Sequence, residues 1–228
     1  MRKLRNLMLY LFSALCVLPI LVVLFASLRG PSGAPSLSGY LALLFRTPNF
    51  YRGFWLSLAY SASIVSFSVV VSMTSAYGLV RYAFRGSRVV LWAYILLMLL
   101  PFQATLVPQY FALRWMGIHH SPAAVILPGV FSTFGAVMIA QYMRGLDHRL
   151  FDAARLDGMN DWQMFVRLAL PLCRPIAMGL LFILFVGAWS MVEQPLVFLQ
   201  DLRQMPLSVS IRMDKRVRSF AYAAGIMY

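Results

Sequence analysis

Long, nearly uninterrupted apolar runs dominate this sequence. A helix needs about 20 mostly apolar residues to cross the hydrocarbon core of a bilayer, because that core is about 30 Å thick. Five runs reach this length, at residues 7–28, 54–80, 89–107, 123–142 and 176–199. The pattern predicts a single transmembrane domain over residues 1–228, an all-α polytopic membrane protein with five complete spans.

A shorter apolar stretch occupies residues 219–228. As a helix it would be about 15 Å long, about half the thickness of the hydrocarbon core. We expect it to be the start of a partial sixth span, in a sequence that is cut short or in a chain that ends early.

Two features of the runs predict how they pack. Pro19 should bend the first span without ending it, because neighbouring helices can satisfy the freed carbonyl. The second run carries small serine side chains at short spacings, which let another helix approach closely. We therefore expect the second span to lie inside the bundle. The serines are Ser57, Ser61, Ser63, Ser66, Ser68, Ser72 and Ser75.

The composition agrees with a membrane protein. Hydrophobic residues make up 61% of the chain, charged residues 12%, and the mean hydropathy is +0.75. A soluble domain of this size could not cover that much apolar surface. The net charge of +13 would suggest nucleic acid in a soluble protein. Here the basic residues lie at the ends of apolar runs, so we expect contact with membrane lipid and not with nucleic acid.

Basic residues also predict the orientation in the membrane. Arg2, Lys3 and Arg5 precede the first span, which favours a cytoplasmic N-terminus by the positive-inside rule. Counting spans then places the polar segment 143–171 in the cytoplasm as well. The basic cluster at residues 212–218 falls on the opposite side and is the main observation against this orientation.

The segment 143–171 is the one substantial amphipathic, charged stretch between apolar runs. Asp147 is a suitable N-cap for a short helix that ends near Leu156, and Gly158 can adopt the left-handed conformation that closes it. Asn160 with Gln163 three residues later forms a capping-box pair for a second helix. We expect two short helices around a glycine turn, with Pro171 and Pro175 breaking the second one.

This segment resembles the docking loop, or EAA motif, of the membrane subunits of binding-protein-dependent ABC importers. The family pattern is Glu-Ala-Ala, a Gly four residues on, and an aliphatic residue and Leu-Pro after a fixed gap. The matching positions, with Asp for Glu and Leu for Ile, are Asp152, Ala153, Ala154, Gly158, Leu168, Leu170 and Pro171. The resemblance implies a type I ABC importer transmembrane domain whose loop, Asp157 included, docks on a separate ATPase subunit. In that setting the small alanines would let the partner surface approach closely.

Other stretches resemble the carbohydrate-uptake branch of that family, of the maltose-transporter second-permease type. They are residues 101–110, 189–199 and 205–207. One departure is Ser190, which stands where Asn usually follows Trp. This likeness implies a sugar or oligosaccharide as the solute.

No catalytic device is visible in the sequence. A phosphate-binding P-loop needs Gly-Lys followed by Ser or Thr, and the only lysines, Lys3 and Lys215, follow Arg2 and Asp214. We therefore expect no enzyme, no catalytic residue and no cofactor in this chain, with ATP and magnesium bound by the partner ATPase. We also expect no metal site, because His119 and His120 lack a carboxylate or cysteine at ligand spacing.

Polar residues inside apolar runs are the candidates for a solute path, because polar groups that face lipid are costly. The candidates are Gln103, Trp189, Ser190, Glu193 and Gln194. Glu193 is the single acid within a span, which argues against an ion-coupled secondary transporter. An equally weighted alternative is that Glu193 caps the outer helix end or pairs with Arg203.

Together these features predict a multi-pass permease subunit of a bacterial inner membrane that works by alternating access. Its expected partners are a second, non-identical permease subunit, two ATPase subunits and an extracytoplasmic solute-binding protein. The alternatives are an importer permease for a non-sugar solute, such as a polyamine, amino acid or oxyanion, and a secondary transporter.

Overall fold

A computed structural model describes residues 2–28, 36–46, 48–82, 84–213 and 226, and among these residues helices are the only regular structure. The chain divides into two compact units, one of residues 1–56 with 205–228 and one of residues 57–204. Apart from Ile226, the predicted partial sixth span from residue 219 lies outside the described residues.

The helices in chain order are α1 (Arg2–Ser27), α2 (Ser38–Arg46), α3 (Pro48–Arg81), α4 (Ser87–Met98), α5 (Phe102–Trp115), α6 (Pro122–Val130), α7 (Thr133–Arg144), α8 (His148–Leu156), α9 (Asp161–Met164), the π-helix η1 (Phe165–Ala169), α10 (Leu170–Leu172), α11 (Arg174–Trp189), α12 (Glu193–Phe198), the 3-10 turn η2 (Leu202–Gln204) and α13 (Leu207–Met213).

Three helical segments among the described residues are long and apolar enough to cross a membrane: Met8–Ser27, Asn49–Arg81 and Pro122–Arg144. The number rises to five if each of two sharply bent helix pairs is one span. As predicted, α1 continues through Pro19. The segment Pro122–Arg144 consists of α6 and α7, with a short break at Phe131 and Ser132.

The third apolar run, 89–107, is not one straight helix. The chain leaves α4 after Met98 and enters α5 at Phe102, and the two helices are bent by 109°. Pro101 is the physical reason, because it has an extended backbone (φ −62°, ψ 137°) and disfavours a helical conformation at the residue before it. Gln103 therefore lies in the first turn of a new helix and not in the middle of a span.

The fifth run, 176–199, ends earlier than the apolar pattern predicts. α11 stops at Trp189, and Glu193 begins the separate helix α12. Pro195 explains the break, since proline lacks an N–H and its ring clashes with the preceding turn of a helix, so it is tolerated in a first turn only. Glu193 and Gln194 thus lie beyond the span in which the sequence placed them.

The unit of residues 57–204 is built around α3, as its serines predict. Ser57, Ser61, Ser68 and Ser72 are all buried. Packing is so close that a Cβ atom at Gly135 of α7 would collide with the Ser72 hydroxyl. Around α3, helix α4 packs along α7, and α7 packs against α11.

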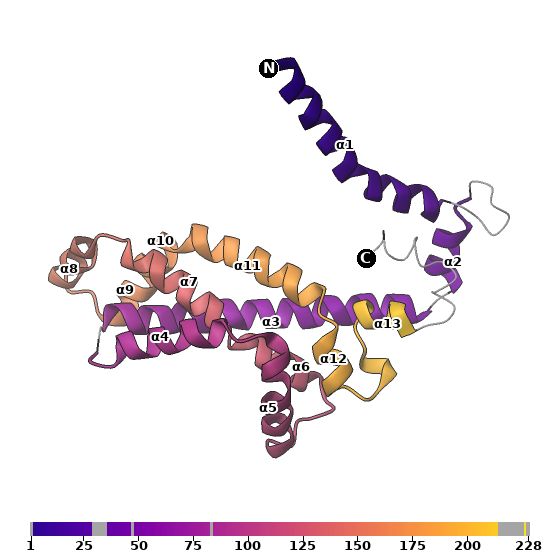
Figure 1. Cartoon of the computed structure of the whole chain (residues 1–228). Coiled ribbons are helices and arrows are strands. Elements are labelled where there is room, and N and C mark those ends of the chain that lie inside the picture. Colours follow the sequence, from indigo (N-terminus) through magenta and orange to yellow (C-terminus); the bar gives the residue numbers. More distant parts are fainter. Residues whose placement is uncertain (1, 29–35, 47, 83, 214–225, 227–228) are drawn as a thin grey trace. The chain divides into compact units, whose positions relative to one another are not determined.

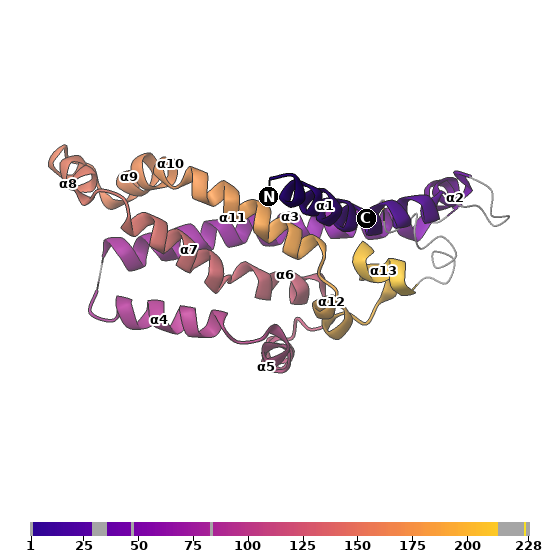
Figure 2. The same cartoon turned by 45° about the horizontal axis from the view of Figure 1, so that its top comes forward.

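Two ends of this unit carry different groups of short helices (Figures 1 and 2). At one end lie α8 and α9, next to the last turns of α3. At the other end α5, α6 and α12 form a second small core around Leu113, Ala124 and Phe198. The two sets of candidate functional residues therefore occur in different parts of the unit.

The other unit contains α1, α2, the first turns of α3 and α13. The Ser27 hydroxyl lies 2.7 Å from the Tyr40 hydroxyl and joins α1 to α2. Gly53 of α3 packs against α13, where an added Cβ atom would lie 2.7 Å from the Ser210 hydroxyl. The stretch that includes Met205, Leu207 and Val209 is buried.

Candidate functional site

The first arm of the docking segment has the structure that its sequence predicts. The Asp147 side chain caps α8 by accepting a hydrogen bond of 3.0 Å from the Arg149 backbone N–H. The helix ends at Leu156, and Gly158 has φ +82°. This left-handed conformation favours glycine, because other side chains are strained there.

The second arm is also capped as predicted. The Asn160 side chain accepts from the Gln163 N–H at 2.8 Å, and the Gln163 side chain accepts from the Asn160 N–H at 3.0 Å. The arm continues through α9, η1 and α10 and ends at Leu172, one residue beyond Pro171. We attribute this continuation to the wider π-helical turn before Pro171, which gives the proline ring room. A bend of 70° then separates this arm from α11.

The inner face of both arms belongs to the core of the unit. Phe151, Phe165 and Ala169 are buried in the same cluster as Tyr77 and Met143 of the long helices. Met164 and Ala154 are buried as well. Because its side chains interlock with those of α3 and α7, the loop is part of the helix packing and not a separate flap.

Polar contacts fix the loop to the end of α3. A guanidinium nitrogen of Arg81 lies 3.6 Å from a carboxylate oxygen of Asp152, and the Arg81 guanidinium lies over the Phe151 ring at 5.3 Å. The Tyr77 hydroxyl donates to the backbone carbonyl of Asp161 at 3.2 Å, and its ring packs edge-on against Phe165. These contacts join both arms to one long helix.

A further ion pair holds the two arms together. The Arg155 guanidinium at the end of α8 lies 3.1 Å from the Asp161 carboxylate at the start of α9. Desolvation and the charge of Asp161 raise the pKa of Tyr82, which follows α3. Asp161 therefore links the second arm to α8 and to the end of α3.

The outer face of the loop exposes large apolar side chains. Leu156 is 89% exposed and Trp162 is 69% exposed. Among the residues that match the family pattern, Ala153, Gly158, Leu170 and Pro171 are exposed, as is Asp157. Leu168 is half-buried, whereas Ala154 is buried against the core. The expectation that both alanines face a partner is therefore wrong for Ala154, whose small side chain packs the loop onto the helices.

Sequence reasoning missed three residues of this site. Tyr77 lies inside the predicted span 54–80, Arg81 lies just after it, and the local pattern identifies Leu156 only as the end of a helix. The available signal for Leu156 is a leucine beside a glycine turn in a charged segment, where an apolar side chain has little of its own chain to cover it. Nothing in the local sequence links Arg81 to Asp152, because the pairing needs the tertiary fold.

The candidate solute-path residues come together in part. The Gln103 amide nitrogen donates to the two carboxylate oxygens of Glu193 at 3.1 and 3.2 Å, joining α5 to α12. Glu193, Gln194 and Ser190 line a hollow of about 380 Å³ with Phe102 and Gly187. For the alternative role of Glu193, the partner that the structure records is Gln103 and not Arg203.

Trp189 and Ser190 differ in their surroundings. The Trp189 ring stacks on Phe185 of α11, with centroids 5.8 Å apart. The Ser190 hydroxyl donates to the Val186 carbonyl at 2.7 Å, which satisfies the last turn of α11. Ser190 therefore terminates a helix as well as lining the hollow.

Comparison with known proteins identifies the family. The model for the binding-protein-dependent transport system inner membrane component matches residues 68–228, which is more than half of the chain. The chain belongs to this family. Its members are inner membrane components of transport systems, in keeping with the apolar helices of this chain.

Individual relatives are more distant. Protein LplC of Bacillus subtilis is 27% identical over 74% of this chain and 57% of its own length. The arabinooligosaccharides transport system permease protein AraQ of Halalkalibacterium halodurans is 26% identical over 71% of this chain and 57% of its own length. The chain thus matches a little over half the length of these two relatives.

One solved structure shares the fold over nearly the whole chain. It is a bacterial ABC transporter involved in the import of the acidic polysaccharide alginate. The TM-score is 0.88 with 18% sequence identity, covering 99% of this chain and 90% of that chain. This chain therefore shares its all-α fold with a chain of that transporter.

Proposed function

We propose that this chain is the membrane-spanning permease subunit of an ATP-driven ABC importer. It translocates a carbohydrate or oligosaccharide by alternating access, and the loop 143–171 docks on a separate ATPase subunit. ATP and magnesium are bound by that subunit, and the chemistry of hydrolysis takes place there. A second, non-identical permease, two ATPases and an extracytoplasmic solute-binding protein complete the assembly.

The observation that supports this proposal most is the two-faced structure of the docking loop. Its inner face is fixed to α3 by Arg81 and Tyr77, whereas its outer face presents Leu156 and Trp162 to the surroundings. Large apolar side chains exposed on a charged segment between spans favour contact with another protein. A partner that moves the loop would therefore move the long helices to which the loop is fixed.

This function also implies an orientation. An ATPase draws on cytoplasmic ATP, so the docking loop lies on the cytoplasmic side of a bacterial inner membrane. Counting back through the predicted spans places the N-terminus on the same side. The arginines at the junction of α3 and α4, Arg81, Arg85 and Arg88, then obey the positive-inside rule.

The carbohydrate assignment rests on different support. The AraQ relative is named for arabinooligosaccharide transport, and the structure with the same fold belongs to an alginate importer. A neutral sugar needs hydroxyl and amide groups from its site. Gln103, Ser190 and Gln194 supply such groups at one end of the unit, next to the Glu193 carboxylate.

A matched pair of variants tests the docking surface. Leu156→Asp places a charge on the outer face of the loop, and Leu202→Asp makes the same change at an exposed leucine outside the loop. We expect Leu156→Asp to abolish co-purification of the ATPase with the assembled transporter, and Leu202→Asp to leave it unchanged. Equal ATPase recovery with the two variants would contradict the proposed docking surface.

A further inference from the structure

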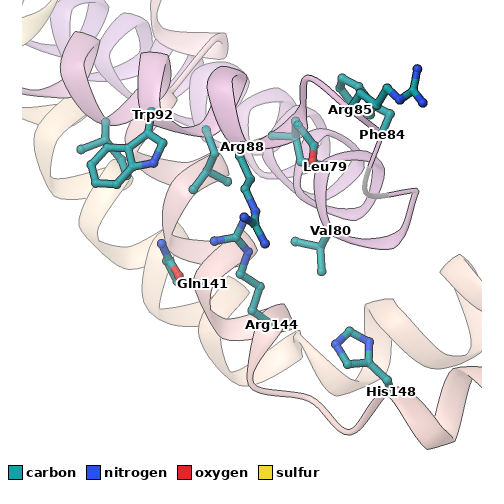
Figure 3. Close-up of a pocket in the computed structure, with 12 residues that line it drawn as sticks. Leu79, Val80, Phe84, Arg85, Arg88, Trp92, Gln141, Arg144 and His148 are labelled. Carbon is teal, nitrogen blue, oxygen red and sulfur yellow. The ribbon is translucent and has the colours of Figure 1, made fainter.

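A large hollow lies beside the docking loop and is used by neither of the sites described above. It is formed where the end of α3, the start of α4, the end of α7 and the start of α8 meet, and it has a volume of about 910 Å³ (Figure 3). Its lining residues are Leu79, Val80, Phe84, Arg85, Ser87, Arg88, Leu91, Trp92, Ile95, Gln141, Arg144 and His148.

The polar lining of this hollow is basic and contains no acid. Arg85, Arg88, Arg144 and His148 contribute to it from three helices and a loop. Figure 3 shows the guanidinium groups of Arg88 and Arg144 pointing toward one another. Over the part of the chain that the structure describes, neither arginine forms an ion pair. Two like charges that face each other repel, so an anion between them would stabilise the arrangement.

The rest of the lining is apolar and continues along α4. Leu91, Trp92 and Ile95 follow Arg88 by one to two helical turns, and Leu79 and Val80 of α3 face the same space. The Trp92 side chain is 64% exposed, although tryptophan is large and apolar. Tryptophan in such a position is typical of the boundary between lipid headgroups and acyl chains. The hollow therefore has a basic end and an apolar wall.

This combination selects one kind of ligand. A free inorganic anion would neutralise the arginines and leave the apolar wall uncovered. A phospholipid carries both parts, a phosphate that arginine binds through two parallel hydrogen bonds and an acyl chain for the wall. Basic pockets between membrane helices on the cytoplasmic side bind anionic lipid headgroups in other proteins.

We propose that this hollow binds one anionic phospholipid of the cytoplasmic leaflet. The phosphate lies between Arg88 and Arg144, and an acyl chain lies along Trp92 and Ile95. The choice of leaflet rests on the proposed function, because it follows from docking of the loop on a cytoplasmic ATPase. A lipid in this position would hold the start of α4 against the end of α7, at the point where α8 begins.

The test uses the complete transporter, with its second permease and ATPases, in phosphatidylcholine nanodiscs. The nanodiscs contain a trace of phosphatidylglycerol that carries a photoreactive group near its headgroup. After irradiation, the labelled peptides are identified by mass spectrometry. Arg88→Gln/Arg144→Gln is compared with Arg114→Gln/Arg203→Gln, which removes the same charge at exposed arginines outside the hollow.

We expect label on peptides from residues 84–95 and 141–148. In Arg88→Gln/Arg144→Gln the yield of these labelled peptides should fall roughly tenfold or more, since each basic residue contributes about 1 kcal/mol to anionic-lipid binding. The control variant should be labelled like the unmodified transporter. Excess unlabelled phosphatidylglycerol should compete, and inorganic phosphate should not.

Three results would overturn the proposal. They are equal labelling of the two variants, competition by inorganic phosphate as effective as that by phosphatidylglycerol, and absence of label because the second permease covers the hollow. ATPase recovery in the same preparations separates this proposal from the proposed function. In the unmodified transporter, absence of label from the hollow with full ATPase recovery contradicts the lipid site alone. Labelling of the hollow in a Leu156→Asp transporter that retains its ATPase contradicts the docking surface alone.

Discussion

Arg81, in the last turn of α3, approaches the Asp152 carboxylate of α8 to 3.6 Å while its guanidinium lies over the Phe151 ring. Asp152 is the residue that stands where the family pattern has glutamate. The acid at this position therefore has a partner within its own chain. It fixes the angle of the docking loop to the helix that forms the centre of the unit.

Replacement of Arg81 should uncouple the loop from α3. Asp152 is largely exposed, so loss of the ion pair itself should cost below about 1 kcal/mol of folding free energy. We expect Arg81→Gln to assemble normally but to lose most solute-stimulated ATPase activity and uptake in proteoliposomes. The activity of Arg81→Lys should lie between those of the unmodified transporter and Arg81→Gln, because lysine keeps the charge but lacks the planar group that stacks on Phe151.

A charge swap provides the control for this coupling. Arg81→Asp combined with Asp152→Arg restores an opposite pair across the same gap. Partial recovery of uptake relative to Arg81→Asp alone would support the pairing. If the swap is as inactive as the single variant while the ATPase still co-purifies, the contact between these two residues does not carry the coupling.

Gly158 offers a test of loop geometry that is free of steric effects. A Cβ atom at this position would meet nothing within 4 Å, but φ is +82°. Gly158→Val should therefore act through the backbone alone, at a local cost of about 1–3 kcal/mol, and misalign the two arms. We expect reduced ATPase co-purification and transport. Gly158→Asn should retain both, because asparagine tolerates the left-handed conformation. Wild-type behaviour of the valine variant would contradict this account.

Close packing of α7 on α3 can be tested with two glycines. Gly135→Val would collide with Ser72 and crowd Leu180, whereas Gly179 of α11 has open space around it. Overpacking of a tight interface costs about 1–3 kcal/mol. We expect a lower Tm of the detergent-purified complex for Gly135→Val and little change for Gly179→Val. Equal Tm values would mean that the helices can move apart without cost.

Much of the docking loop follows from local sequence. Asp147, Asn160 with Gln163, and Gly158 each determine their conformation through hydrogen bonds or backbone preferences within a few residues, and these predictions are confirmed. Burial of Ala154 could not be predicted in this way. The alternation of exposed and buried faces on a nine-residue helix depends on where α3 and α7 lie.

Apolar runs were less reliable guides to helix ends. The runs 89–107 and 176–199 are predominantly apolar, yet each is broken near a proline. Hydropathy reports how well a segment partitions into lipid, whereas Pro101 and Pro195 change the backbone without changing that preference. As a result, Glu193 lies at the start of α12 and not within a span. The contact of Glu193 with Gln103 requires two such breaks and is a tertiary property.

The Gln103–Glu193 pair predicts an effect on solute affinity. If these groups face the solute, Gln103→Ala and Glu193→Gln should each raise the apparent KM of uptake by roughly 2- to 10-fold, the usual range for one lost hydrogen bond. Gln200→Ala, at an exposed glutamine outside the hollow, is the control. Unchanged KM values for both variants, with normal protein levels, would remove the pair from the solute path.

The carbohydrate assignment predicts the preference of the cognate solute-binding protein. A polyamine site would need several acids and an oxyanion site would need arginines close to the path, but the hollow at α5 and α12 is lined by one acid, an amide and a hydroxyl side chain with apolar neighbours. A sugar fits this set because its hydroxyl groups donate and accept hydrogen bonds without carrying charge. We expect a thermal-shift screen against sugars, polyamines, amino acids and oxyanions to give its largest Tm increase with a mono- or oligosaccharide, since bound ligand stabilises the folded state by mass action.

Uptake of that sugar by the reconstituted transporter should require ATP. A response confined to a non-sugar class would refute the carbohydrate assignment and leave the importer assignment intact, whereas uptake driven by an ion gradient without ATP would favour a secondary transporter.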